Sequence, residues 1–225
     1  SKSPRDKDKS TAPTGAFIED VQSFPAVALG IPPRRVEVMD PQQRMALEVS
    51  LDAVADAGVG VADLPHRTGV FMGVTAVEMR TLLAGRILAQ LMASGSLGDA
   101  PEDATELARS VERLVPPRPL TAPGLLANMT AATIAQELHL HGPAFTSDAA
   151  CASALVSISE AVAALRAGRI DCALAGGVYI CLTPEHHIAF SRIGAMSRQG
   201  RCLPFDSQAD GFVQGDGCGV LVLKR

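Results

Sequence analysis

The chain has 225 residues, of which 47% are hydrophobic and 20% are charged, a balance typical of a globular domain with a substantial core. A formal net charge of −4 and a pI near 5.7 argue against a surface for nucleic acid or for anionic membranes. The charged first residues do not form a secretory signal, and no apolar run reaches the roughly 18 residues that a membrane span needs. We therefore expect a soluble protein, and its five cysteines, an odd number without a C-x-x-C pair, favour a reducing cytoplasm.

The N-terminal part predicts a polar leader and then a capped helix. Residues 1–15 are rich in charged residues, Ser, Pro and Gly, and we expect them to be a flexible leader to a folded domain over residues 16–225. Prolines keep residues 24–35 irregular. Asp40 then caps a helix with Pro41 in its first turn, and Gly58 ends it.

Residues 69–138 predict one short strand followed by helices. The apolar run 69–74 is typical of a buried strand. A helix is expected over 77–92, a loop over 94–103 and an amphipathic helix around residues 107–114, which the proline-rich run 115–119 must end. A further helix is expected over residues 128–138.

The segment that follows predicts a strand, a tight turn, a helix and a second strand. The two strands are expected over 144–148 and 170–175, and the helix over 152–167, with Gly168 ending it. A β–turn–α–β unit is the building block of a layered α/β fold. Beyond it, residues 191–219 read as a glycine-rich loop and 220–223 as a final strand.

Cys151 lies at the turn of this unit. The N-terminus of a helix carries partial positive charge and free N–H groups, which favour a thiolate and can stabilise an oxyanion. Small neighbours, Ala149 to Ser153, would let a bulky substrate reach the sulfur. The competing interpretation is that a lone cysteine is a small buried hydrophobe. The other cysteines, for which packing is the better interpretation, are Cys172, Cys181, Cys202 and Cys218.

Around Cys151 the segment D-A-A-C-A-S (148–153) resembles the active-site motif of β-ketoacyl synthases, the condensing enzymes of polyketide and fatty-acid synthases. Other motifs of that family occur in its order along the chain. They are M-D-P-Q-Q-R (39–44), A-L-A-G-G-V (173–178), F-S-R (190–192), G-A-M-S (194–197), P-F-D (204–206), A-D-G-F (209–212) and G-D-G (215–217). The two-helix insertion before residue 128 resembles iterative polyketide and polyunsaturated-fatty-acid synthases more than modular ones.

The resemblance implies a thiolase-like fold, an α-β-α-β-α layered sandwich, of which this chain would be the N-terminal half without the family's first strand. It implies that Cys151 is the nucleophile and that its backbone N–H is an oxyanion donor. The acyl group would arrive on the phosphopantetheine arm of an acyl carrier protein, with no bound cofactor and no metal. The enzyme would then condense that group with a malonyl-type extender, and the resemblance also implies a homodimer.

The same resemblance places two histidines and a lysine, which complete the condensation, in a second half beyond Arg225. A C-terminal ketosynthase half or a partner chain would supply them, and this chain alone would hold the acyl group on Cys151. Its five histidines, His66, His139, His141, His186 and His187, are better interpreted as surface or helix-end residues than as metal ligands.

Two alternatives stay open at this point. One is a non-condensing ketosynthase-like protein that transfers or holds acyl groups or scaffolds a complex. The other is a relative of thiolases or ketoacyl-CoA synthases, which the D-P-Q-Q-R helix disfavours. An apolar stripe in the first insertion helix would line an acyl tunnel, dock a carrier, or, as such stripes more often do, pack in a core or dimer contact. Its members are Leu82, Leu83, Ile87, Leu88, Leu91 and Met92.

Overall fold

Helices cover both faces of a four-stranded sheet in the larger of the two units into which the chain divides. The structure is a computed structural model that describes residues 9–225. The larger unit comprises residues 20–179 and 218–225, and the smaller one residues 9–19 and 180–217.

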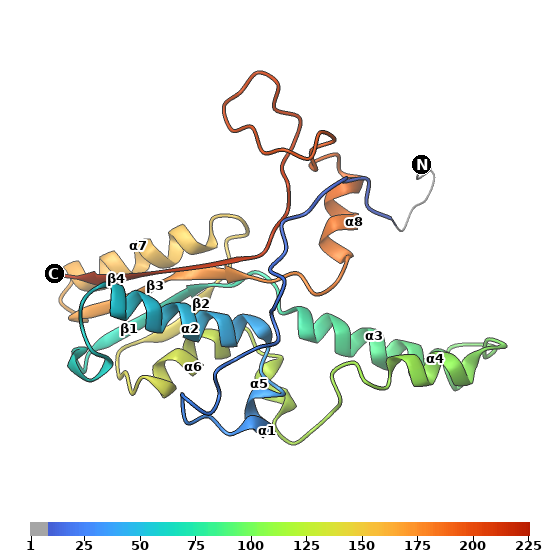
Figure 1. Cartoon of the computed structure of the whole chain (residues 1–225), viewed down its shortest axis with the longest axis horizontal. Helices are drawn as coiled ribbons and strands as arrows, with labels where there is room; N and C mark the ends of the chain where they lie inside the picture. The colour runs from blue at the N-terminus through green and yellow to red at the C-terminus, as the bar shows by residue number, and fades with distance from the viewer. Residues whose placement is uncertain (1–8) are drawn as a thin grey trace. The chain divides into compact units, whose positions relative to one another are not determined.

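The sheet of the larger unit has the strand order β2-β1-β3-β4 (Figure 1). The strands are β1 (Thr68–Gly73), β2 (Ala144–Ser147), β3 (Cys172–Tyr179) and β4 (Gly217–Lys224). β1 lies in the middle and pairs in parallel with both β2 and β3. Strands β2 and β3 are joined through α7 (Ser153–Arg166), so the predicted β–turn–α–β unit is confirmed.

The two faces of the sheet are covered by different helices. α7 packs on one face, and α2 (Pro41–Asp56) and α6 (Met129–Glu137) pack on the other (Figure 1). Because side chains alternate along a strand, Phe71 faces α7 whereas its neighbours Val70 and Met72 face α2 and α6. The cluster beneath α7 is built from one aromatic ring and small or branched side chains. Its buried members are Phe71, Ala161, Ala164, Leu165, Ile170, Ala173 and Ala175.

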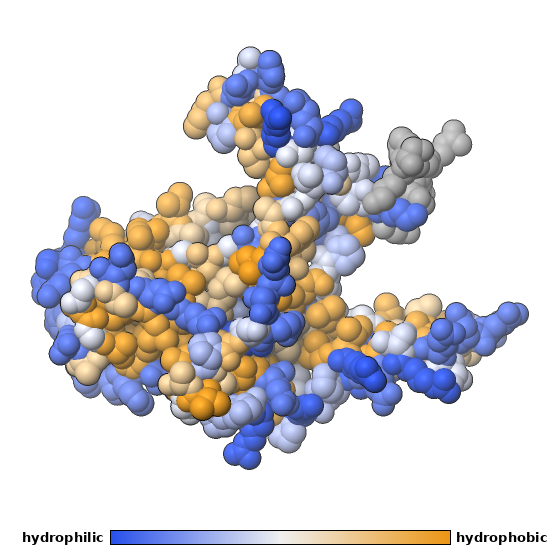
Figure 2. Space-filling view, viewed as in Figure 1, coloured by the Kyte–Doolittle hydropathy of each residue, from blue (hydrophilic) through white to orange (hydrophobic). Residues whose placement is uncertain are grey.

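The insertion forms two helices, as predicted, but its apolar stripe is not a core. α3 (Glu78–Ala93) and α4 (Ala104–Val111) pack against each other. Four stripe residues stay 39–51% exposed, and Figure 2 shows apolar surface along this part of the chain. Those residues are Ile87, Leu88, Leu91 and Met92. Core packing is therefore the wrong interpretation for them within this chain.

Three short elements complete the larger unit: α1 (Pro33–Val36), η1 (Val61–Asp63) and α5 (Thr121–Gly124). The prolines around residues 24–35 predicted irregular chain, yet α1 begins on one of them. Proline suits the first turn of a helix because its ring already holds the helical φ and it has no N–H to leave unbonded.

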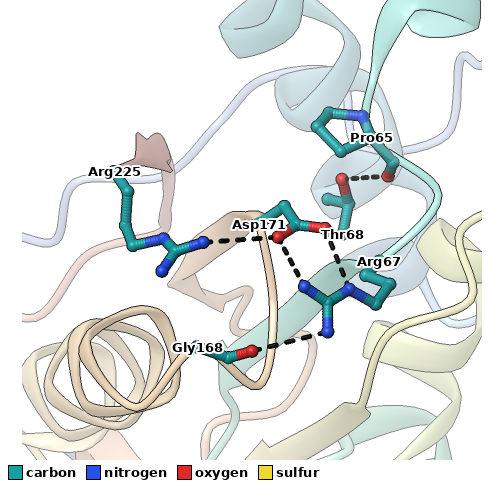
Figure 3. A network of polar contacts seen from close by, with 6 residues as sticks. All are labelled: Pro65, Arg67, Thr68, Gly168, Asp171 and Arg225. Carbon is teal, nitrogen blue, oxygen red and sulfur yellow. Dashed lines mark hydrogen bonds and ion pairs between the residues drawn. The ribbon is translucent and has the colours of Figure 1, made fainter.

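A polar network ties three segments together at the amino ends of β1 and β3 (Figure 3). The Arg67 guanidinium donates Nε and Nη2 to the two carboxylate oxygens of Asp171, at 2.9 and 2.7 Å. It also donates to the Gly168 carbonyl, at 3.4 Å, and Arg225 approaches the same carboxylate at 3.6 Å. The network links the start of β1, the α7–β3 connection and the end of β4.

The smaller unit is mostly loop, but it contains one helix that the sequence did not predict, α8 (Glu185–Arg192). The Asp216 carboxylate organises this unit by accepting the N–H groups of Ile18, at 3.1 Å, and Cys181, at 2.8 Å. Ser10 bonds to the Ser191 hydroxyl at 2.9 Å. Residues 1–8 of the predicted leader lie outside the described residues, and the leader's flexibility stays a prediction.

Among residues 9–225, no helix is both long enough and apolar enough to span a membrane.

Candidate functional site

Cys151 lies in the connection between β2 and α7, as the sequence predicts. Strand β2 ends at Ser147 and helix α7 begins at Ser153, so the thiol stands just before the first helical turn. Its side chain is exposed. The position of the thiol is therefore confirmed, and the competing interpretation of a buried cysteine is wrong for this residue.

The turn lies at the carboxyl edge that three parallel strands share. Gly73, the last residue of β1, is in register with Ser147 of β2 and with Gly177 of β3. The carboxyl edge of a parallel sheet is where α/β proteins place their reactive groups, because the loops there converge. Cys151 belongs to one of those loops.

Glycines allow the start of α7 to lie directly on this edge. A Cβ added to Gly73 would stand 2.5 Å from the Ser153 carbonyl carbon and 2.6 Å from the Ala154 nitrogen. A Cβ on Gly177 would stand 2.8 Å from the Ala154 Cβ. On the face towards α7, side chains thus shrink from Phe71 to Gly73 along β1, and the helix comes closest where the thiol is.

Short hydrogen bonds define the turn itself. Ala150, the residue before the thiol, has φ of 51°, in the left-handed region that non-glycine residues rarely adopt. The Ser153 hydroxyl donates to the Ala150 carbonyl at 2.6 Å and accepts the Ala149 N–H at 2.8 Å. The Asp148 carboxylate accepts the Ala150 N–H at 2.9 Å.

The N-terminus of α7 carries no compensating negative charge of its own. Its N-cap residue, Ala152, makes no side-chain cap, and the first turn contains no acidic residue. The positive end of the helix dipole is therefore left for a charge that develops next to it. This environment suits the oxyanion that forms when a nucleophile attacks a carbonyl.

The D-P-Q-Q-R segment supports the architecture at a distance from the thiol. Asp40, only 1% exposed, accepts the Gln42 N–H at 2.8 Å and the Met79 N–H at 3.3 Å. One carboxylate thus caps α2 and also bonds the first turn of α3. Burial raises the pKa of the Asp40 carboxyl, and the bonds from these N–H groups oppose that rise.

The polar side chains after Asp40 bind two loops and the short helix α5. Gln42 Nε2 donates to the Ala76 carbonyl at 2.7 Å, and Gln43 Nε2 donates to the Pro123 carbonyl at 3.0 Å. Arg44 donates to the Gln22 carbonyl at 2.9 Å. Burial lowers the pKa of Arg44. These residues act as structural ties.

Histidines do not form a metal site in the described part of the chain. The rings of His66 and His141 stack with centroids 4.0 Å apart and planes at 5°. Over residues 9–225, no group of three or more His, Cys, Asp or Glu could hold a metal ion. His187 packs beside Phe17, with ring centroids 5.4 Å apart.

The remaining cysteines differ in exposure. Cys202 is exposed, and its sulfur accepts the Val213 N–H at 3.1 Å. Cys172 is buried, and burial raises the pKa of its thiol. Burial raises the pKa of the Cys218 thiol to about 12, so this thiol stays protonated at neutral pH. Cys202 therefore needs separating from Cys151 in any labelling experiment.

A cavity of about 250 Å³ lies elsewhere in the larger unit, between α1, α2, α5 and α6. Three of its polar lining residues, Arg35, Gln43 and Gln136, already have partners. Arg35 bonds to Glu137 at 2.5 Å and to Gln136 at 3.2 Å, and Gln43 bonds to Pro123. Cys151 does not line it.

The sequence singled out Cys151 and noted Ser153 only as a small neighbour, and it did not identify Gly73, Thr75 and Gly177 as parts of its surroundings. The available signal was the glycines at 73 and 176–177, close to the ends of two predicted strands, together with small residues directly after the cysteine. The contacts of these residues depend on tertiary structure, so the sequence pattern alone does not specify them.

Comparison with known proteins shows which family the chain is similar to. The family profile described as "Beta-ketoacyl synthase, N-terminal domain" matches residues 1–225. A component of the phenolphthiocerol/phthiocerol polyketide synthase of Mycobacterium tuberculosis is 42% identical over 216 residues, which are 96% of this chain and 12% of that protein. Polyketide synthase PksN of Bacillus subtilis is 33% identical over 98% of this chain and 4% of its own length.

Solved structures agree. The ketosynthase from module 6 of the bacillaene synthase of Bacillus subtilis matches with a TM-score of 0.72 and 31% identity, over 96% of this chain and 31% of that one. An oxazolomycin ketosynthase domain from Streptomyces albus matches with a TM-score of 0.74 and 26% identity, over 96% and 33%. The predicted thiolase-like fold is confirmed, and the chain spans about a third of these solved chains.

Proposed function

Because the chain belongs to the β-ketoacyl synthase family, we propose that Cys151 accepts an acyl group and that the protein condenses this group with a malonyl-type extender in polyketide or fatty-acid biosynthesis. The observation that carries the proposal is the exposed thiol at the uncapped N-terminus of α7, on the carboxyl edge of the sheet. The similarity to ketosynthases of polyketide synthases supports the same reaction.

The first step is transfer of the acyl group. The Cys151 thiolate attacks the carbonyl carbon of an acyl thioester on the phosphopantetheine arm of a carrier protein. The tetrahedral oxyanion then collapses, the bond to the phosphopantetheine sulfur breaks, and that sulfur leaves as a thiolate that takes up a proton. The backbone N–H of Cys151 is the proposed oxyanion donor, supported by the positive end of α7.

The second step forms the new carbon–carbon bond. A malonyl thioester on a carrier protein loses CO₂, and the resulting carbanion attacks the acyl carbon on Cys151. The bond from that carbon to the cysteine sulfur breaks, which regenerates the thiolate and releases a β-ketoacyl thioester that is two carbons longer. Histidines and a lysine from a further ketosynthase segment or a partner chain would assist this step.

The proposed partners follow from this chemistry. They are an acyl carrier protein, the segment that supplies the histidines, and a second copy of the chain in a homodimer. Acyl groups arrive on the carrier, so no resident cofactor is proposed, and the cytoplasm is the proposed location of the reaction. The alternative is a protein that accepts an acyl group but does not condense it. Such a protein would carry out the first step and not the second, so only the second step distinguishes the two functions.

Intact-mass spectrometry tests the first step. The full protein is incubated with acyl carrier protein charged with a short acyl chain, and peptide mapping then locates the adduct. We expect one acyl adduct on Cys151, none after Cys151→Ala, and an unchanged adduct after Cys202→Ala, which removes another exposed thiol. An adduct that survives Cys151→Ala would contradict the proposal. Adding malonyl carrier protein and detecting the β-ketoacyl product then separates condensation from acyl transfer.

A further inference from the structure

The residue before the thiol holds a conformation that its own side chain disfavours. Ala150 has φ of 51°. In that region the Cβ of an L-residue crowds its own backbone, so alanine adopts it only when its surroundings hold it there. Glycine lacks the Cβ and adopts such a conformation freely. Something in the fold must therefore hold this turn.

Ser153 makes the contacts that can do so. Its hydroxyl donates to the Ala150 carbonyl at 2.6 Å and accepts the Ala149 N–H at 2.8 Å, so it bonds peptide groups on both sides of the strained residue. The Ser153 N–H also donates to the Ala150 carbonyl, at 3.0 Å. The residue is 5% exposed, which protects these bonds from competing water.

The end of β1 holds this serine from the other side. The Thr75 hydroxyl lies 3.4 Å from the Ser153 hydroxyl and from the Ala150 carbonyl. The absence of a side chain on Gly73 leaves the room in which the Ser153 backbone lies. The serine is thus fixed against the sheet while its hydroxyl bonds the turn.

We propose that Ser153 is a positioning residue for the reaction of Cys151: its hydroxyl holds Ala150 in the left-handed conformation and so aims the thiol and its N–H at the incoming thioester. The inference rests on the proposed function, because it assigns Ser153 a part in that same acylation. A left-handed residue turns the chain sharply. If Ala150 relaxed to an extended or right-handed conformation, the Cys151 Cα–Cβ bond and N–H would point elsewhere relative to α7.

A merely structural role for Ser153, as a stabiliser of the first turn of α7, predicts a different result. Such a role would lower the melting temperature but would not depend on which residue occupies position 150. The positioning role predicts energetic coupling between the two positions, because glycine at 150 removes the strain that the hydroxyl opposes. The double variant therefore separates the two roles.

The experiment measures the acylation rate of Cys151 by a short-chain acyl thioester, its alkylation rate by iodoacetamide, and the melting temperature. The variants are Ser153→Ala, Ala150→Gly and both together. Ser159→Ala is the matched control, because it makes the same change at an exposed position of the same helix.

We expect Ser153→Ala to slow acylation about tenfold, the factor by which one lost hydrogen bond shifts a two-state equilibrium. Alkylation, which uses no oxyanion donor, should slow less. Ala150→Gly alone should stay within about twofold of the wild type, and in the Ser153→Ala background it should restore most of the lost acylation rate. Ser159→Ala should match the wild type.

The positioning role is overturned if Ser153→Ala is acylated at the wild-type rate, or if the double variant folds but is acylated as slowly as Ser153→Ala. The proposed function stands in both cases. Equal slowing of acylation and alkylation also overturns the positioning role, because the hydroxyl would then govern access to the thiol and not its aim. If Cys151 of the wild type is not acylated at all, the proposed function is refuted, and the positioning role of Ser153 is refuted as well.

Discussion

Replacing Asp40 tests whether one buried carboxylate holds two helices. Asp40 accepts the N–H of Gln42 at 2.8 Å, as the N-cap of α2, and the N–H of Met79 at 3.3 Å, in the first turn of α3. In Asp40→Ala the lost cap costs about 1 kcal/mol. The Met79 N–H loses its acceptor in a buried place, which costs at least about 1 kcal/mol more. We expect a total loss of about 2–3 kcal/mol in the free energy of unfolding.

Asp40→Asn should cost less than Asp40→Ala. The amide oxygen can still accept the Gln42 N–H, but the amide nitrogen then faces the Met79 N–H and cannot accept it. We expect a loss of about 1 kcal/mol, the net value of one hydrogen bond. Asp56→Asn, the same change at an exposed position near the end of α2, should stay within about 0.5 kcal/mol of the wild type.

The pH dependence gives an independent check. Burial raises the pKa of the folded Asp40 carboxyl above its ordinary value, so the native state binds this proton more tightly than the unfolded state does. The wild type therefore loses stability as the pH rises from the ordinary carboxyl pKa, about 3.9, to the raised value. Neither variant can titrate here, so the stability gap between wild type and variant should narrow over that range.

Urea unfolding followed by circular dichroism between pH 3.5 and about 8 measures this gap. Wild-type stability of Asp40→Asn at every pH would refute the double-cap reasoning. A gap that widens as the pH rises would refute the raised pKa, because it would mean that folding favours the ionised carboxylate.

Three further predictions concern packing, thiol chemistry and the exposed ion pair. Gly73→Ala should destabilise the fold by about 1–3 kcal/mol in thermal unfolding, because its Cβ would collide with the start of α7. Gly85→Ala, in open space on α3, is the control and should stabilise the fold by up to about 1 kcal/mol. Peptide mapping after brief alkylation at pH 8 should find Cys202 modified and Cys218 unmodified, because the Cys218 pKa is about 12; early labelling of Cys218 would contradict its burial. Arg67→Ala should lower the melting temperature slightly at neutral pH and low salt. The hydrogen bonds from Arg67 lower the pKa of the Asp171 carboxyl, and the ion pair is lost once Asp171 is protonated, so the difference in melting temperature should vanish in acid. An equal difference at pH 2 would contradict the ion-pair explanation.

Local chemistry explains which features were predictable. The helix from Asp40 to Gly58 was found because its cap, its first-turn proline and its terminating glycine act within a few residues. The bond from Asp40 to the Met79 N–H was not found, because the two residues meet only after folding. Sequence therefore revealed the cap but not its second function.

The predicted end of strand β3 was wrong because of two glycines. The sequence predicts that this strand ends at residue 175, directly before Gly176 and Gly177, but β3 continues to Tyr179. In the fold they serve close approach, since a Cβ on Gly176 would meet the Gly219 carbonyl oxygen and one on Gly177 would meet Ala154. A single sequence does not distinguish a glycine that ends a strand from a glycine that allows another segment to pack closely.

The two ends of α7 have different roles: one anchors the helix in the core, and the other lies next to the reactive thiol. Its C-terminal half carries the buried residues Ala161, Ala164 and Leu165, which pack with Phe71 in the hydrophobic cluster and anchor the helix. Its first turn depends instead on close backbone approach at Gly73 and on the hydroxyl of Ser153. Because the anchored half keeps the helix in place, the first turn can leave a thiol exposed and hold a strained residue beside it. That division explains how an otherwise unfavourable turn persists where the proposed reaction needs it.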